Sequence, residues 1–403
     1  MVAADDVEKL IVVRRLSAHY ILPGDGRVLK YGILELDSEG RVLSLVDTGG
    51  TLRETQGLEF FNGVLVPGFV NAHCHLELSH LAGRVNARGL VPFLKSVLRY
   101  RSETCPISVM ESADREMWAE GIVAVGDISN TASSFSVKRS SSLIYHTFVE
   151  LSGLDPGIAN SVMDKGNVLL RQLSEMGLRG SLSPHAPYSV SRALMEALLD
   201  QALFAHHIVS VHHQESEQEN LLFQRGEGSF LPFLREIYPS FQEEGPPGVS
   251  SFEYFSDLLV RFPRLLMVHN TFSDPVQLAG MPSLCERSAW VFCPRSNFLL
   301  EGRLPDAECF FRAGLRVALG TDSLASNGSL SVLSEMRLLQ EVFPAIPFPV
   351  LVQWATSNGA WALGLEEHLG KFSRGLRPGV NLIERIDLNT IRLLPQSRVR
   401  RIL

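Results

Sequence analysis

Short runs of apolar residues recur along most of the chain, and each run ends in polar or glycine-rich residues. The runs are apolar throughout instead of alternating with polar residues, which is typical of strands that are buried on both faces. Eight such runs predict eight parallel strands, at residues 64–70, 122–127, 146–151, 180–185, 208–212, 265–269, 290–294 and 317–322.

Between most of these runs, apolar residues return at helical spacing, for example in residues 189–203 and 331–343. Eight strands that alternate with helices favour an α/β fold, a closed (β/α)8 TIM barrel. An open, doubly wound sheet is the alternative fold with the same alternation.

The two ends of the chain have a different pattern. Residues 1–60 contain short strand-like segments separated by turns, and strand-like segments return at residues 380–383 and 390–394. We therefore expect both ends to pair in one small β-sandwich domain, residues 1–60 plus 371–403, beside a barrel domain of residues 61–370.

Composition narrows the classes of function. The chain has 37 Lys and Arg against 44 Asp and Glu, a net charge of −7, which argues against nucleic acid as a partner. No apolar run reaches the roughly 18 residues that a membrane helix needs, and the acidic residues 1–6 are unlike the basic start of a secretory signal. The five cysteines include no Cys-x-x-Cys motif, so we expect a reducing compartment, the cytoplasm.

Histidines gather at the carboxyl ends of the predicted strands: His73, His75, His185, His212 and His269. The active site of a TIM barrel lies at this end, so these imidazoles are expected to meet there. His73 and His75 flank Cys74, and on an extended chain both rings project from the same face, where they form a pincer for one metal ion. The alternative is a pair of histidines hydrogen-bonded to the backbone.

The fifth predicted strand ends in two adjacent histidines, His212 and His213, and either can reach the same centre. Glu215 lies three residues after His212 and supplies a carboxyl group that can move protons near a metal ion. Because an ideal strand would point His212 and Glu215 to opposite faces, the strand must end between them.

His269 ends the sixth predicted strand and Asp322 ends the eighth. Imidazole nitrogens closed by one carboxylate form a donor set suited to Zn²⁺ or Fe²⁺. Taken singly, His269 is explained as a core histidine and Asp322 as a helix N-cap. Their joint position at strand ends favours a metal site.

The order of these motifs resembles that of the amidohydrolase superfamily, in the branch that holds cytosine, guanine, adenosylhomocysteine and aminodeoxyfutalosine deaminases and the triazine chlorohydrolases. The similarity extends over nearly the whole chain, in residues 67–75, 183–189, 212–215, 269–270, 296–297, 320–323, 356–360 and 375–379. The family's β-sandwich, built from both termini, agrees with the pattern at the chain ends.

The resemblance implies four metal ligands: His73, His75, His212 and Asp322. It selects His212 over His213, and it implies Asp322 also as the base for the attacking water. Glu215 is implied as the proton shuttle, and His269 as the group that orients this water or polarises the substrate. Binuclear members carry a carbamylated lysine on strand four, which this sequence lacks, so one divalent ion is expected, Zn²⁺ with Fe²⁺ as the alternative.

Four residues are expected to contact the substrate: His185, Asn297, Glu77 and Glu150. The resemblance implies His185 and Asn297, on the fourth and seventh strands. Glu77 lies in a segment that resembles the His-x-His-Leu-Glu-Phe-Ser stretch of aminodeoxyfutalosine deaminases. Glu150 ends the third predicted strand, where a carboxylate can accept hydrogen bonds from sugar hydroxyls.

The resulting hypothesis is a metal-dependent hydrolase that deaminates an amino-substituted heterocycle, an adenine-type nucleoside such as aminodeoxyfutalosine or a related purine. The alternatives are hydrolysis of another leaving group on a ring, by a chlorohydrolase or cyclic amidase, and a barrel that binds a ligand without catalysis. The implied ligands and the shuttle are all present in the sequence, which argues against the non-catalytic barrel. The expected partner is a small molecule, and a homodimer is the assembly left open.

Overall fold

The computed structural model describes residues 13–100, 102–238 and 245–403. The acidic residues 1–6, used above against a secretory signal, lie outside the described residues. Within the described ranges, no helix combines the length and the apolar composition needed to cross a membrane.

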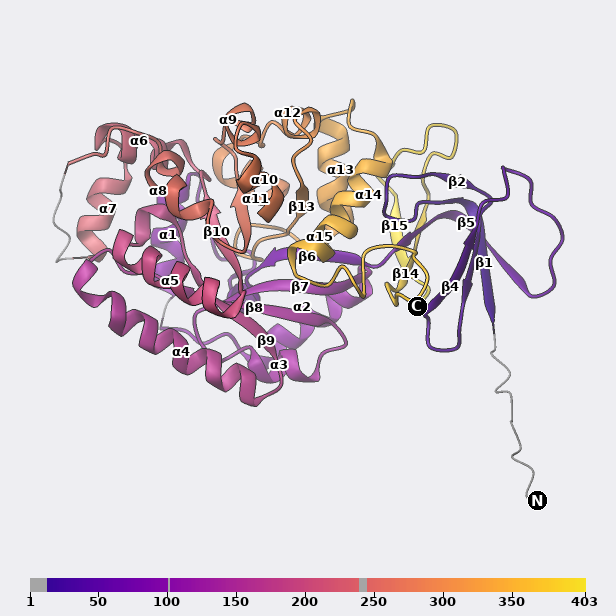
Figure 1. Ribbon diagram of the computed structural model, residues 1–403, viewed down its shortest axis with the longest axis horizontal. Coiled ribbons are helices and arrows are strands. Elements are labelled where there is room, and N and C mark those ends of the chain that lie inside the picture. Colours follow the sequence, from indigo (N-terminus) through magenta and orange to yellow (C-terminus); the bar gives the residue numbers. More distant parts are fainter. Residues whose placement is uncertain (1–12, 101, 239–244) are drawn as a thin grey trace, which may run out of the picture.

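Eight parallel strands form the centre of the larger part of the molecule, in two groups of four neighbours (Figure 1). The first group, β6-β7-β8-β9, consists of Phe69–Cys74, Ile122–Ser129, Ile144–Leu151 and Arg179–Pro184. The second group, β10-β11-β12-β13, consists of Ile208–His213, Arg264–His269, Ser288–Phe292 and Val317–Leu319. Each predicted strand between residues 122 and 322 overlaps one of these strands.

Two seams close the groups into a barrel. Between β13 and β6, the backbone N–H groups of Thr321 and Asp322 donate to the carbonyl of His73, at 3.0 and 3.1 Å. Between β9 and β10, the backbone N–H of His212 donates to the carbonyl of His185 at 2.9 Å. The predicted (β/α)8 barrel is therefore confirmed, and the open sheet is wrong.

Helices connect the strands and surround the barrel (Figure 1). The helices are α1 (Leu90–Arg99), α2 (Ile107–Ala119), α3 (Phe135–Ser140), α4 (Ala159–Glu175), α5 (Arg192–Ala205), α6 (Glu217–Arg225), α7 (Phe230–Ile237), α8 (Ser251–Leu259), α9 (Pro275–Ala279), α10 (Pro282–Arg287), α11 (Pro294–Glu301), α12 (Ala307–Arg312), α13 (Val332–Val342), α14 (Phe348–Ala355) and α15 (Ser357–Ala362), with 3-10 turns η1 (Leu76–Leu81), η2 (Pro156–Ile158) and η3 (Pro187–Ser189). The two helices predicted above are α5 and α13. Each begins directly after a serine, Ser191 or Ser331, whose Oγ accepts a hydrogen bond from the first turn.

The two ends of the chain form a separate seven-stranded sheet, in which the first and last parts of the sequence lie side by side (Figure 1). Its strands are β1 (Arg14–Ile21), β2 (Leu29–Lys30), β3 (Ile33–Leu36), β4 (Val42–Val46), β5 (Leu58–Pro67), β14 (Val380–Glu384) and β15 (Arg398–Arg401). The order is β15-β14-β5-β1-β3-β4, with β2 on β1, and β5 pairs antiparallel with β14. The prediction that both ends pair in one β unit is confirmed.

The first predicted strand, residues 64–70, was wrong in its bounds, because two strands meet within it. β5 ends at Pro67 in the terminal sheet, and β6 begins at Phe69 in the barrel. Gly68 lies between them, and a Cβ at this position would lie 2.2 Å from Val123 Cγ1. Only glycine leaves room for the chain to pass from one sheet to the other here.

The predicted strand at residues 390–394 was also wrong. In the described part of the chain, this segment contains no strand, and β14 pairs with β15 on the side away from β5. Arg398 and Arg400 of β15 bind one carboxylate, Glu384 of β14, at 2.8 and 3.0 Å. These ion pairs hold β15 at the edge of the sheet. Its residues are mostly arginines, so the apolar pattern did not predict this strand.

The barrel strands have an inner and an outer core. Small and medium apolar side chains fill the inside, among them Val70, Ala72, Ala124, Val268 and Ala318, and Leu363, Leu365 and Leu369 close the amino end. Larger side chains pack between the outer face and the helices. Alternation along a strand therefore indicates which side chains face the barrel axis, except where the backbone departs from it, as at the register shift in β6 between Asn71 and Cys74.

Candidate metal centre and active site

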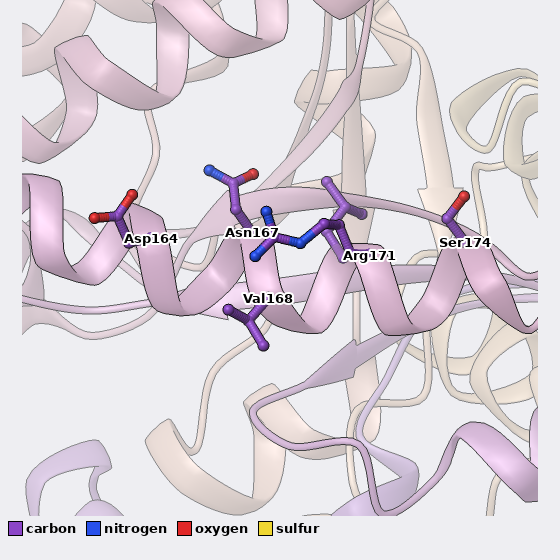
Figure 2. A pocket seen from close by; sticks show the side chains of 6 residues that line it. Asp164, Asn167, Val168, Arg171 and Ser174 are labelled. Carbon is purple, nitrogen blue, oxygen red and sulfur yellow. The ribbon is translucent and has the colours of Figure 1, made fainter.

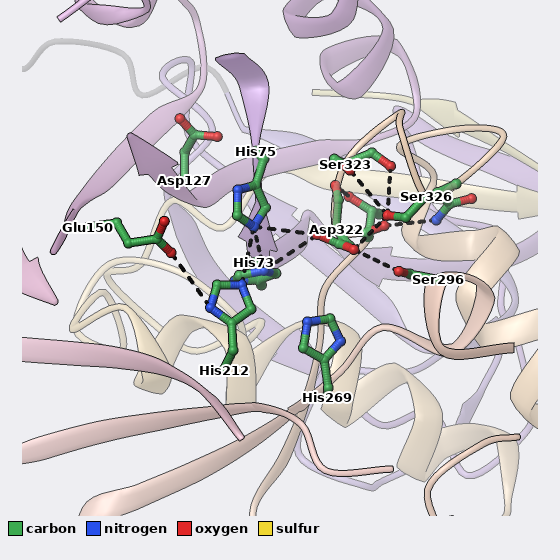
Figure 3. Close-up of polar contacts among 12 residues, drawn as sticks. His73, His75, Asp127, Glu150, His212, His269, Ser296, Asp322, Ser323 and Ser326 are labelled. Carbon is green, nitrogen blue, oxygen red and sulfur yellow. Dashed lines mark hydrogen bonds and ion pairs between the residues drawn. The ribbon is translucent and has the colours of Figure 1, made fainter. Parts of the chain in front are cut away.

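The carboxyl ends of β6, β10, β11 and β13 bring five predicted residues together: His73, His75, His212, His269 and Asp322 (Figure 3). His75 Nε2 lies 3.1 Å from His73 Nε2 and 3.3 Å from His212 Nε2. Asp322 Oδ1 lies 3.6 Å from His73 Nε2 and 3.5 Å from His75 Nε2. Three ring nitrogens and one carboxylate oxygen thus converge on one point.

These residues fit a divalent metal ion. Burial lowers the pKa of His73, and it lowers the pKa of His75 to about 4. Each neutral imidazole has one N–H hydrogen and one nitrogen lone pair. Hydrogen bonds between the facing rings therefore cannot satisfy all of the lone pairs in the cluster. Neutral imidazoles with one carboxylate are the donors that Zn²⁺ and Fe²⁺ take in proteins.

The alternation along β10 separates the two adjacent histidines. Val209 and Val211 belong to the outer core, so His212 faces the barrel axis and His213 faces outward. His213 packs against the Phe252 ring of α8 at 5.6 Å between centroids, and only His212 lies with the other histidines.

As predicted, β10 ends between His212 and Glu215, at His213. Gln214 has a φ of 44°, in the left-handed region that non-glycine residues seldom adopt. This turn breaks the alternation, so Glu215 comes back to the side of His212. Its Oε1 lies 3.6 Å from His269 Nε2.

His269 also depends on an unusual backbone. Its neighbours Leu265 and Met267 face the outer core, so the alternation alone would point His269 outward. A φ of 77° turns its side chain toward the cluster, where the ring stacks on that of His212 at 5.4 Å. Burial lowers the pKa of His269 well below its usual value, so the ring is neutral.

The two carboxyl groups of the site differ in charge. Burial and the nearby Asp322 raise the pKa of Glu215 well above its usual value. Burial alone would also raise the pKa of Asp322, but its contact with His73 and its interaction with the nearby rings of His75 and His269 lower it well below the usual value. The surroundings therefore favour the protonated form of the Glu215 carboxyl group and the ionised form of the Asp322 carboxyl group.

A second set of contacts orients His212. Its Nδ1 lies 2.8 Å from the carbonyl oxygen of His185 and 3.6 Å from Glu150 Oε1. The carbonyl can only accept, so Nδ1 carries the hydrogen and Nε2 keeps its lone pair toward the cluster. Burial would raise the pKa of Glu150, but the rings of His185, His212 and His75 lower it to about 2.

His185 and Asn297, which were predicted to contact the substrate ring, lie on different kinds of element. His185 follows β9 directly, its Nδ1 is 2.7 Å from Ser189 Oγ, and its ring lies 5.0 Å from that of His212. Asn297 is fully buried on α11, not at a strand end, and its amide donates to Thr271 Oγ1. Its position on the seventh strand was therefore wrong, because β12 ends at Phe292.

Glu77 lies in the η1 turn after His75, and hydrogen bonds from the β7–α3 loop occupy its carboxylate. Oε2 accepts from the N–H groups of Asn130 and Thr131, both at 3.2 Å, and Oε1 accepts from Thr131 Oγ1 at 3.0 Å. Asn130 Nδ2 in turn donates to Glu150 Oε2 at 2.9 Å. The loop after β7 thus links the two predicted acidic contacts.

Sequence reasoning missed a buried ion pair below this loop. Lys138 Nζ of α3 lies 2.6 Å from Asp127 Oδ2 of β7, and both side chains are fully buried. Asp127 Oδ1 accepts from the Leu76 N–H at 2.7 Å, which fixes the chain just after His75. The run at residues 122–127 ended in this acid, but nothing local pointed to its partner.

The hollow in Figure 2 lies elsewhere, on the outer helix α4. Its lining comes from α4 alone: Asp164, Asn167, Val168, Leu170, Arg171 and Ser174. None of these residues belongs to the histidine cluster.

The Amidohydrolase family model matches residues 64–390. The chain is 30% identical over 315 residues to the adenosine deaminase of Helicobacter pylori, an alignment that covers 76% of each chain. It is 28% identical over 334 residues to the aminodeoxyfutalosine deaminase of Nitratiruptor, which covers 80% of this chain and 79% of the relative.

Solved structures share the fold. The Helicobacter pylori aminofutalosine deaminase in complex with methylthio-coformycin superposes with a TM-score of 0.81 at 24% identity, over 97% of this chain and 100% of that one. An adenosine deaminase from Xanthomonas campestris with bound zinc gives 0.69 at 22%, over 93% and 85%. A triazine hydrolase from Arthrobacter aurescens gives 0.69 at 16%, over 92% and 86%. The chain therefore belongs to the amidohydrolase family, whose members are metal-dependent hydrolases.

Proposed function

We propose that this protein is a hydrolytic deaminase of an amino-substituted heterocycle, an adenine-type nucleoside such as aminodeoxyfutalosine or a related purine. One divalent ion, Zn²⁺, is held by His73, His75, His212 and Asp322. The observation that carries the proposal is the convergence of these donors at the barrel end, with Glu215 and His269 beside them.

The relatives support the leaving group and the substrate class. Both relatives described above are named as deaminases, of adenosine and of aminodeoxyfutalosine. The structural neighbour from Xanthomonas campestris holds zinc. Strand β9 carries no lysine, which supports one ion instead of two.

The two carboxyl groups divide the proton transfers. When bound, zinc polarises the substrate and lowers the pKa of water from about 15.7 to about 7. Asp322 Oδ1, which faces the histidine rings, accepts a proton from the attacking water. Glu215 donates a proton to the ring nitrogen beside the reacting carbon. A C–O bond forms at this carbon, the bond to the exocyclic nitrogen breaks, and the proton on Asp322 leaves with that nitrogen as ammonia. The remaining proton on the new oxygen passes to Glu215, so the product is a ring carbonyl and both carboxyl groups return to their starting states.

The neighbouring residues position the reactants. His269, neutral and 3.6 Å from Glu215, orients the water or polarises the ring. His185 and Asn297 contact the heterocycle. Glu150 Oε1 is buried without a hydrogen-bond partner among the described residues, so it is ready to accept from a sugar hydroxyl. Glu77 contributes through the loop that it holds against Glu150.

An ammonia-release screen on zinc-loaded protein tests the proposal. Adenine nucleosides with modified 5′ groups should release ammonia with loss of the adenine absorbance, and the Glu215→Gln variant should not release it. The structural neighbour that is a triazine hydrolase supports a different leaving group as the alternative. Turnover of chlorinated triazines or cyclic amides, with no ammonia from any purine or pyrimidine amine, would show that the deaminase proposal is wrong.

The setting of the reaction is part of the proposal. All five cysteines are free thiols, which supports the reducing cytoplasm. The partner is a small molecule, and nucleic acid has no part in the proposed reaction. Sedimentation of the purified protein tests the homodimer, and a monomer at working concentrations would exclude it.

A further inference from the structure

The carboxylate of Asp322 uses its two oxygens differently (Figure 3). Oδ2 accepts hydrogen bonds from Ser296 Oγ and Ser326 Oγ, both at 2.6 Å. Oδ1 faces the rings of His73 and His75 at 3.6 and 3.5 Å. The serines therefore hold one oxygen while the other points to the proposed metal position.

The chemistry of the serines makes this arrangement directional. A hydroxyl has one hydrogen to donate, and each serine donates its hydrogen to Oδ2. Oδ2 therefore accepts two short hydrogen bonds, and all three side chains are buried. A rotation that turned both carboxylate oxygens toward the metal would break both of these buried hydrogen bonds, which is costly.

A single buried carboxyl group ties together the backbone next to all three residues. Glu335 Oε2 of α13 accepts from the Arg295 N–H at 2.9 Å, and Oε1 accepts from Asn327 Nδ2 at 2.7 Å. Asn327 Nδ2 also donates to the Thr321 carbonyl at 2.8 Å. Arg295, Asn327 and Thr321 adjoin Ser296, Ser326 and Asp322 in the chain.

We propose that Ser296 and Ser326 are positioning residues that hold Asp322 as a ligand through Oδ1 alone, and that Glu335 fixes the first turn of α11 and the loop after β13, which carry them. The inference rests on the proposed metal site, and it deepens that proposal by naming what orients its carboxylate. It predicts that removal of either hydroxyl weakens metal binding without removing a ligand.

Zinc affinity, measured by competition with a chromogenic chelator, tests this inference without any substrate. Ser296→Ala and Ser326→Ala should each weaken zinc binding about 10-fold, and the double variant up to about 100-fold, the range seen when a partner of a metal ligand is lost. Glu335→Gln should weaken it about 10-fold, because its amide group would oppose the donor of Arg295 or Asn327. Ser288→Ala is the matched control, since Ser288 is equally buried and its Oγ has no hydrogen-bond partner among the described residues.

Urea unfolding of the metal-free proteins separates positioning from folding. The single variants should unfold close to the wild type without metal and should differ from it only with zinc. Wild-type zinc affinity in both single serine variants would overturn the inference, as would an equal loss in Ser288→Ala. If the double variant does not fold, the single variants and Glu335→Gln decide. Because the readout is zinc affinity, failure of the deaminase proposal leaves this result interpretable.

Discussion

The two ends of the barrel are built in opposite ways. At the carboxyl end, buried polar atoms remain without hydrogen-bond partners in the part of the chain that the structure describes: His73 Nδ1, His269 Nδ1, Glu150 Oε1 and Asn297 Oδ1. The backbone there takes positive φ angles at four non-glycine residues: Gln214, His269, Asn270 and Asp322. Strained backbone and unpaired polar atoms therefore occur together where the proposed chemistry takes place.

The amino end is closed by ion pairs, hydrogen bonds and cation–π contacts within the chain. Arg264, at the start of β11, binds Glu366 at 2.9 Å and donates to the Trp361 carbonyl at 2.6 Å. The Trp361 ring lies under two guanidinium groups, 4.4 Å from that of Arg264 and 3.6 Å from that of Arg316. Arg179, at the start of β9, donates to the Gly364 carbonyl.

The difference shows that the two ends of the barrel contribute unequally to stability. Contacts at the amino end raise the free energy of unfolding. The unpaired ligands and proton carriers at the carboxyl end lower it. Changes at the carboxyl end should therefore alter function with little loss of stability, and changes at the amino end should do the reverse.

The largest expected effect comes from the adjacent histidines of β10. His212→Ala should lose zinc affinity by more than the roughly 100-fold that loss of an outer partner costs, and activity with it, because a proposed ligand is gone. His213→Ala is the matched control, since it removes the same ring one residue further along, on the outward face. Metal content by elemental analysis checks both, and retention of full metal by His212→Ala with loss in His213→Ala would reverse the assignment.

Glu215→Gln should keep its zinc but lower kcat about 10²- to 10⁴-fold, because glutamine cannot carry a proton. Its unfolding in urea should be close to that of the wild type, since Gln fills nearly the same volume. Parallel assays of ammonia release and metal content check this prediction. Near-wild-type turnover would show that the proton comes from another group.

Arg264→Ala should lower the free energy of unfolding by about 2 kcal/mol, since it removes charged hydrogen bonds and a cation–π contact. Zinc content and kcat/KM should stay within about twofold, because the change lies at the opposite end of the strands. Arg84→Ala is the control: Arg84 forms an exposed pair with Glu103 at 2.8 Å, which contributes at most about 1 kcal/mol. Urea denaturation measures both, and a loss of activity without a loss of stability in Arg264→Ala would contradict the division between the ends.

The smallest effect is expected at Cys74, between two proposed ligands. Its side chain belongs to the outer core, and burial raises the pKa of the thiol well above its usual value. Cys74→Ala should keep its zinc and lose about 1 kcal/mol of stability from the small cavity. Should the variant lose its metal, the side chain of Cys74 faces the site and not the helices.

Much of the fold was predictable from local patterns. Apolar runs mark strands buried on both faces, because such strands have no exposed side to make polar. The strand-end histidines and Asp322 were predictable for a related reason, since a parallel barrel brings all carboxyl ends to one rim. The apolar pattern did not predict the break at Gly68, where close packing against Val123 admits only glycine. It also did not predict β15, which ion pairs with Glu384 hold in the sheet.

The amino-acid sequence by itself determined which side chains stand at the rim of the barrel. Only the tertiary structure decided how they are held. Ser296 lies 26 residues from Asp322 in the chain, Lys138 lies on a helix apart from Asp127, and Glu335 binds both the first turn of α11 and the loop after β13. None of these contacts follows a local period, because each exists only after the barrel closes and excludes water from the groups that it brings together.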